Sequence, residues 1–174
     1  MKAIQVDGEG LIWADYAAPE CGPGEILIQV KATAINRADL MQRAGGYAPP
    51  PGASEIMGLE CAGEVVELGA GVDGFKIGDG VCALLAGGGY AEQVVVPAGQ
   101  VLPIPSGLNF VEATALPEVF ATAYLNLYME GALQDGERVI LHAGASGVGT
   151  AAIQMLKYTN NPTFVTVGCD DKLA

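Results

Sequence analysis

The sequence predicts a β-rich domain followed by the start of a parallel α/β domain. Short, β-branched segments punctuated by Gly and Pro fill the first two-thirds of the chain. From Asn109 onward, apolar residues recur at helical spacing, and residues 138–168 read as strand, glycine turn, helix and strand. We place the domains at residues 1–115 and 116–174.

The β-rich part is expected to fold as a compact barrel or sandwich, because its candidate strands are short and regularly spaced. Residues 38–44 are predicted to form a short helix closed by Gly45 and Gly46. Residues 47–54 must be a loop, because their three consecutive prolines cannot pair in a sheet. The predicted strands, of which the first two form a hairpin across the turn at 7–10, are 2–6, 11–16, 24–35, 58–72, 75–85 and 88–99.

The second part begins with a helical stretch at residues 108–133, for which Asn109 and Glu112 provide a capping box. Pro117 should divide that stretch into two helices. The remaining elements are expected to be a strand at 138–143, a helix at 149–159, a strand at 163–168 and the opening of a helix at 170–174.

Composition limits the classes of function. Eight Lys and Arg against 20 Asp and Glu give a net charge of −12, which repels nucleic acid and anionic membranes. No apolar run reaches the roughly 20 residues of a membrane span, and the first residues are too polar for a signal peptide. Four scattered cysteines indicate reduced thiols, so we expect a cytoplasmic protein that binds neither nucleic acid nor membranes.

The glycine turn "HAGASGVGTAAIQ" at residues 142–154 carries the chemistry. Gly144, Ser146 and Gly149 occupy the three positions of a dinucleotide fingerprint, with Ser in place of the second glycine. Small residues there let the backbone approach a pyrophosphate at the positive end of the following helix. The alternative is a simple tight connection. We assign the pyrophosphate to Gly144, Ala145, Ser146, Gly147, Val148 and Gly149.

The residues at and after the end of the predicted strand at 163–168 favour NADP as cofactor. An acid at this place would bind a ribose 2′-hydroxyl, whereas this chain has Gly168 and Cys169, with Lys172 close behind to neutralise a 2′-phosphate. Asp170 and Asp171 oppose that reading unless they face solvent.

Four separated motifs carry a resemblance to a known family. "AINRADLMQRAGGY", "PPPGAS", "LLAGGGYAEQVVVP" and the glycine turn together resemble the medium-chain dehydrogenase/reductase superfamily, within it the zinc-independent quinone oxidoreductase branch. The resemblance implies a GroES-like catalytic domain followed by a Rossmann domain, and a homodimeric enzyme about twice this length. The 174 residues are then its N-terminal half, with the first βαβ unit of the Rossmann domain, and are expected to have little activity alone.

Zinc-dependent relatives hold a metal at positions that correspond, by this resemblance, to Asn36, Leu59 with Glu60, and Glu118. Leu cannot ligate zinc and Asn is a poor ligand, so we expect no metal. A structural role for Glu60 is the expected one. A single histidine, His142, is also too few for a histidine-based site and is expected to be a satisfied strand-end residue.

The resemblance implies that Asn36 and Tyr47 line the cleft beside the nicotinamide as catalytic residues, and that Asn36 and Thr122 contact the cofactor. Their alternatives are a helix cap, a half-buried loop aromatic and a mid-helix threonine. Asp39 is either a residue that orients the cleft or a solvated acid, and Met41 and Met57 are expected in the core.

The sequence leaves three candidate functions. The first is an NADPH-dependent, zinc-independent reductase of quinones or other electron-poor carbonyl or enone acceptors. The second is an enoyl-reductase-like enzyme of the same superfamily. The third is a non-catalytic GroES-like interaction module.

Overall fold

The computed structural model describes residues 1–8 and 10–172. The chain divides into two compact units, Met1–Pro117 and Glu118–Ala174, whereas we expected the division after residue 115. Glu9 of the predicted hairpin turn, and Leu173 and Ala174 of the predicted last helix, lie outside the described residues.

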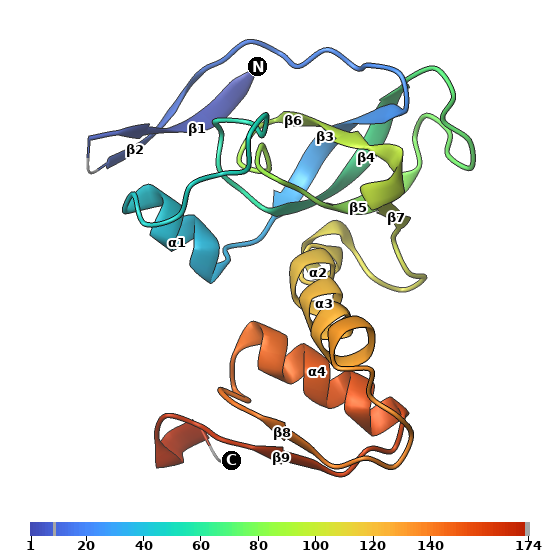
Figure 1. Cartoon of the computed structure of the whole chain (residues 1–174). Helices are drawn as coiled ribbons and strands as arrows, with labels where there is room; N and C mark the ends of the chain where they lie inside the picture. The colour runs from blue at the N-terminus through green and yellow to red at the C-terminus, as the bar shows by residue number, and fades with distance from the viewer. Residues whose placement is uncertain (9, 173–174) are drawn as a thin grey trace. The chain divides into compact units, whose positions relative to one another are not determined.

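The first unit is built on a five-stranded antiparallel sheet (Figure 1). Its strand order is β6-β3-β4-β5-β7, and a separate antiparallel hairpin, β1-β2, meets the loop before β6 through an isolated bridge between Ala3 and Ala91. The strands are β1 (Lys2–Asp7), β2 (Gly10–Asp15), β3 (Glu25–Thr33), β4 (Glu60–Leu68), β5 (Gly80–Leu84), β6 (Gln93–Pro97) and β7 (Val101–Pro103).

This sheet curls but does not close, so the expected compact barrel or sandwich is corrected to an open sheet with an attached hairpin. Closure would require β7 to pair with β6. The three residues of β7 pair only with β5 among the described strands, and Leu102 in its middle is exposed.

The largest buried cluster of the first unit lies against one face of the sheet, and a smaller cluster of Ala62, Cys82 and Ala113 lies against the other. Alternate residues of a half-buried strand point to the same face, and Ile26 and Ile28 of β3 are both completely buried. Each such side chain contributes about 1.5–3 kcal/mol by leaving water. The largest buried cluster consists of Ile26, Ile28, Cys61, Val65, Val81, Ala83, Leu85, Val94, Val96 and Val101.

The helices of the first unit are α1 (Arg37–Arg43), α2 (Phe110–Ala113) and a single 3-10 turn, η1 (Ala98–Gln100). The predicted capping box is confirmed: Asn109 Oδ1 accepts from Glu112 N at 3.0 Å, and Asn109 N donates to Glu112 Oε2 at 2.9 Å. The predicted break is confirmed as well, because Pro117 ends the stretch and opens the next helix, α3 (Pro117–Tyr124).

The second unit contains the predicted βαβ element. Strands β8 (Val139–Leu141) and β9 (Thr163–Val165) are parallel, and α4 (Gly147–Tyr158) connects them. A single 3-10 turn, η3 (Asp170–Lys172), follows β9. Parallel neighbours require such a crossover, and helical spacing between two short apolar runs is its sequence signature.

A π-helix, η2 (Leu125–Glu130), continues α3 where the sequence predicts ordinary α-helix. Gly131 N donates to Asn126 O, five residues back, at 3.0 Å. A Cβ at residue 131 would lie 2.7 Å from that same oxygen, so glycine permits the wide last turn. Helical periodicity does not report this local change.

Candidate cofactor and substrate site

The glycine turn joins the carboxyl end of β8 to the amino end of α4. Ser146 N donates to Ala143 O at 2.9 Å, which closes the turn, and Gly144 N donates to Thr166 O at 2.9 Å, which ties it to the chain after β9. Ala143 has a φ of +57°, a conformation that costs energy in a residue with a side chain. The turn is therefore fixed at the edge where parallel strands end and ligands of such sheets bind.

Two of the predicted glycines are required by close packing. A Cβ at Gly144 would lie 2.6 Å from the Cβ of Val165 on β9. A Cβ at Gly149 would lie 2.6 Å from the carbonyl oxygens of both Ala143 and Gly144. Both glycines are buried, and they allow α4 to start directly on the turn.

Ser146, the residue in place of the second fingerprint glycine, is the N-cap of α4. Its Oγ accepts from Gly149 N at 3.1 Å. Helix geometry leaves the preceding amides, those of Gly147 and Val148, without partners inside the helix, and both residues are exposed. These amides and the helix dipole fit a pyrophosphate group.

The residues assigned to the 2′-phosphate follow β9. Gly168, Cys169 and Lys172 are all exposed, and Lys172 N donates to Cys169 O at 3.2 Å to close the single turn η3. Asp170 and Asp171 form the first residues of that turn and are also exposed. A cation and two acids thus share one short turn.

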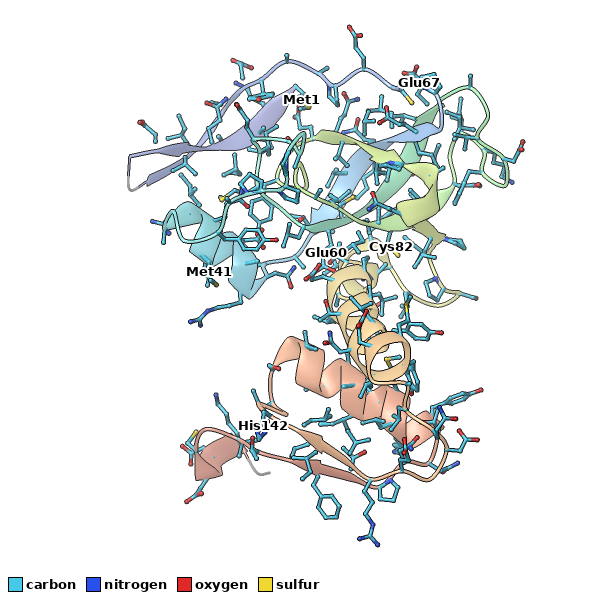
Figure 2. All side chains as sticks on the ribbon, in the orientation of Figure 1. Met1, Met41, Glu60, Glu67, Cys82 and His142 are labelled. Carbon is cyan, nitrogen blue, oxygen red and sulfur yellow. The ribbon has the colours of Figure 1, made fainter. Side chains whose placement is uncertain are left out.

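Two further residues of the second unit lie near the strand ends or on α3. His142, labelled in Figure 2, has Nδ1 3.1 Å from Thr166 Oγ1, and this hydrogen bond fits the expected strand-end role. Thr122 is half-buried on α3, and its carbonyl accepts from Asn126 Nδ2 at 2.8 Å. Thr122 therefore lies within α3, which the π-helix η2 continues.

In the first unit, the half-buried Asn36 lies at the start of α1 beside two buried acids, Asp39 and Glu60, which form a polar cluster with it. Its Nδ2 donates to Glu60 Oε1 at 2.7 Å, and its backbone N donates to Asp39 Oδ2 at 2.7 Å. Glu60, labelled in Figure 2 at the start of β4, is almost fully buried. Thr33 Oγ1 donates to its carbonyl at 2.7 Å. Asn36 and Tyr47, the two predicted catalytic residues, flank α1, and Tyr47 is 38% exposed in the loop that follows it.

Helix α1 buries its acid and exposes its apolar residues. Asp39 is 2% exposed, whereas Leu40 is 54% and Met41 is 44% exposed. The prediction that Met41 lies in the core is therefore wrong, and the prediction for Met57 is confirmed. Seven residues make only two turns, so the sequence does not reveal which face of so short a helix is buried. Asp39 is thus not the solvated acid that the sequence left as one alternative.

Tyr90 is a member of this cluster that the sequence analysis did not single out. Its hydroxyl donates to Ala34 O at 3.2 Å. Burial comes first, then a hydrogen bond with the Asp39 carboxylate and the negative charges of Asp39 and Glu60; together they raise the pKa of Tyr90 well above its usual range. The available signal was the motif "AGGGY", in which a run of glycines precedes a single aromatic residue.

The described part of the chain contains no group of three or more His, Cys, Asp or Glu side chains arranged to hold a metal ion. At the positions matched to zinc ligands, Asn36 is bonded to Glu60, and Leu59 is buried and apolar. Glu118 belongs to the second unit. Cys21, Cys61, Cys82 and Cys169 are free thiols.

Comparison with known proteins identifies the family. Residues 22–106 match the model of the alcohol dehydrogenase GroES-like domain. The human synaptic vesicle membrane protein VAT-1 homolog is 41% identical over 147 residues, which are 84% of this chain and 37% of that protein. The chain belongs to the medium-chain dehydrogenase/reductase superfamily.

Two solved structures of medium-chain dehydrogenase/reductase enzymes extend the match over both units. The CurK enoyl reductase has a TM-score of 0.90 at 28% identity, covering 99% of this chain and 55% of its own. The quinone oxidoreductase of Thermus thermophilus, whose structures include a complex with NADPH, has a TM-score of 0.82 at 34% identity and covers 99% and 55%. The predicted fold, a GroES-like domain followed by the first βαβ unit of a Rossmann domain, is confirmed.

The chain spans about half the length of these two enzymes and less of the VAT-1 homolog. Among the helices of residues 1–8 and 10–172, none is both long and apolar enough to cross a membrane.

Proposed function

We propose that the protein is an NADPH-dependent, zinc-independent reductase of quinones or other electron-poor carbonyl or enone acceptors. The observation that carries this proposal is the glycine turn, in which Gly144 and Gly149 permit close packing and Ser146 leaves the amides of Gly147 and Val148 open. The superfamily consists of oxidoreductases, and the similar Thermus enzyme was solved with NADPH.

On the cofactor side, NADPH would supply the reducing hydride, and the chain would hold it. The turn binds the pyrophosphate through backbone amides, while Lys172 pairs with the 2′-phosphate. Exposure of Asp170 and Asp171 supports this assignment, because solvated acids oppose phosphate binding less than buried ones.

On the substrate side, the segment around α1 offers apolar surface beside polar anchors. The apolar side chains exposed there are Ile35, Leu40, Met41 and Tyr47. Asn36 lies at the edge of the polar cluster that it forms with Asp39 and Glu60. Such a surface suits a planar, apolar acceptor whose oxygen needs only one or two hydrogen bonds. In this role Asn36 contacts cofactor or substrate, and Tyr47 binds or protonates the reduced oxygen.

A second candidate is an enoyl reductase that acts on carbon–carbon double bonds of acyl chains. It is favoured by the TM-score of 0.90 with the CurK enoyl reductase. A compactin diketide synthase of Penicillium citrinum, 40% identical over 148 residues, is a further relative.

We place the protein in the cytoplasm and expect it to form a homodimer. The alternative to a catalytic function is that of a GroES-like interaction module.

The test is a substrate panel on the complete protein with NADPH and NADH. A quinone, a conjugated enone and an enoyl thioester would each be supplied at equal concentration while nicotinamide absorbance is followed. Faster oxidation of NADPH with the quinone or enone supports the first proposal, and preference for the thioester selects the second. Failure to oxidise either cofactor with every acceptor leaves the interaction module.

Elemental analysis of the same dialysed protein tests the absence of zinc from the mechanism. We expect less than one zinc per chain, because Leu59 cannot ligate and Asn36 is committed to Glu60. One tightly held zinc per chain would contradict a zinc-independent reductase.

A further inference from the structure

The segment Gly87–Tyr90 is built to seat one aromatic ring. Gly58 has a φ of +102°, and a Cβ there would lie 2.7 Å from Tyr90 Cδ1. A Cβ at Gly89 would lie 2.9 Å from Glu60 O. Tyr90 N donates to Met57 O at 3.0 Å, and Gly89 N donates to Gly58 O at 3.1 Å. Glycine at residue 58 thus lets the ring pack against the backbone, and the two hydrogen bonds fix the backbone of residues 89 and 90.

The seated ring delivers its hydroxyl to the turn before α1. Tyr90 Oη donates to the carbonyl of Ala34 at 3.2 Å, two residues before Asn36. A phenol is protonated at physiological pH, and burial, the hydrogen bond with Asp39 and the charges of Asp39 and Glu60 raise the pKa of Tyr90 further, so the hydroxyl is a donor here.

Asp39 binds the backbone of the same turn. Its Oδ2 accepts the backbone N–H of Asn36 at 2.7 Å, and the residue is 2% exposed. Its carboxylate is also a hydrogen-bond partner of the Tyr90 hydroxyl, whose pKa it raises. Asp39 is therefore linked both to the backbone of Asn36 and to the ring that reaches Ala34.

We propose that Tyr90, acting with Asp39, is a positioning residue for Asn36. Three groups meet at residues 34–36: Tyr90 on the carbonyl of Ala34, Asp39 on the amide N of Asn36, and Glu60 on its side chain. Together they fix the backbone and the amide of Asn36. The proposal deepens the proposed function and rests on it, since Asn36 is the group presented to cofactor or substrate.

A double-mutant cycle on the complete protein tests the proposal. We expect Tyr90→Phe to lower kcat/KM by about tenfold, because a misplaced contact group weakens transition-state binding. In an Asn36→Ala background the same change should cost less than about twofold, since the residue through which Tyr90 acts is gone. Tyr158→Phe, which removes a hydroxyl from a side chain 89% exposed in the other unit, is the matched control. An equal loss in both backgrounds, or no loss from Tyr90→Phe, overturns the proposal.

A second readout does not depend on turnover. In ¹⁵N-labelled protein, the side-chain amide of Asn36 is assigned by its loss in Asn36→Ala. We expect Tyr90→Phe, but not Tyr158→Phe, to shift that resonance and to speed its exchange with water. An unchanged amide overturns the positioning role even if the protein is a reductase. A changed amide in a protein without reductase activity supports positioning while the proposed function fails.

Discussion

At Gly149, helix α4 comes so close to the turn before it that a Cβ would lie 2.6 Å from two carbonyl oxygens. The fingerprint predicts a small residue at this place, and the structure supplies the reason. At Gly168, which was assigned to the cofactor for the same smallness, an added Cβ would have no neighbouring atom within 4 Å. Close packing therefore requires glycine at residue 149, whereas it places no such requirement on residue 168.

Gly149→Ala should destabilise the second unit by about 1–3 kcal/mol, because the added methyl group must displace backbone. Gly168→Ala is the matched control and should change the free energy of unfolding by less than about 0.5 kcal/mol. Urea denaturation followed by circular dichroism measures both. Equal stability of the two variants would contradict the close approach at Gly149.

The buried thiols make a prediction about alkaline pH. Burial, with the neighbouring Cys82 and Glu60 adding to it, raises the pKa of Cys61 from 9.0 to about 12. The folded pKa lies above the unfolded one, so the stabilisation is complete below pH 9 and is lost as pH rises from 9 toward about 12. Each such group contributes a slope of up to about 1.4 kcal/mol per pH unit within that window.

We therefore expect the free energy of unfolding to fall between about pH 9 and pH 11, and to fall less steeply in Cys61→Ala. The slope persists in part because Cys82 and Tyr90 also have raised pKa values. Denaturation curves under reducing conditions at several pH values provide the measurement. The same slope in both proteins would show that Cys61 does not keep its proton through burial.

Single residues were also where the sequence was least informative. Asp39 and Met41 exchange the burial that their polarity suggests, because α1 packs through its acid. Tyr90 gave no periodic signal, and its partner Ala34 is 56 residues away in the chain. Such contacts depend on tertiary arrangement, which local pattern does not encode.

At the scale of elements, capping residues and prolines predicted the ends of helices more reliably than apolar periodicity predicted the type of helix. Asn109 with Glu112 caps α2, and Pro117 opens α3, as predicted. The π-helix η2 was missed because helical periodicity does not distinguish it from α-helix, although Gly131 permits the close approach of Asn126 O that its last turn requires. Capping residues and prolines act within one turn of helix, so their effect can be predicted from the local sequence. A change from α-helix to π-helix also depends on the contacts of the residues that follow the helix.

The N-cap of α4 links stability to cofactor binding. Ser146→Ala should cost about 0.5–2 kcal/mol, because Gly149 N loses its acceptor. Ser146→Asp keeps an acceptor and should be close to the unchanged protein in stability, yet its charge at the pyrophosphate position should weaken NADPH binding by about tenfold or more. Thermal unfolding and cofactor titration of both variants separate the two effects. NADPH affinity unaffected by Ser146→Asp would place the pyrophosphate elsewhere.

For the whole molecule, the order of element types and the local pairings could be predicted, the β1-β2 hairpin and the parallel β8-β9 pair among them. The pairing within the five-stranded sheet could not be predicted. Alternation and glycine turns predict strands, but β3 pairs with β4 and with β6, whose residues begin 35 and 68 positions after Glu25. The open sheet in place of a barrel follows from those non-local pairs. The family was accessible because its motifs are short and fixed in order, and the matches to both units agree with it.

The central claim is that the glycine turn and Lys172 hold NADPH, and titration of the complete protein with NADPH and NADH by calorimetry tests it most directly. We expect NADPH to bind more tightly, and Lys172→Ala to weaken NADPH by about tenfold or more while NADH barely changes. Lys157→Ala, which removes an exposed cation from the last turn of α4, should leave both affinities unchanged. Tighter binding of NADH by the unmodified protein, or equal losses for both cofactors in Lys172→Ala, would contradict the account.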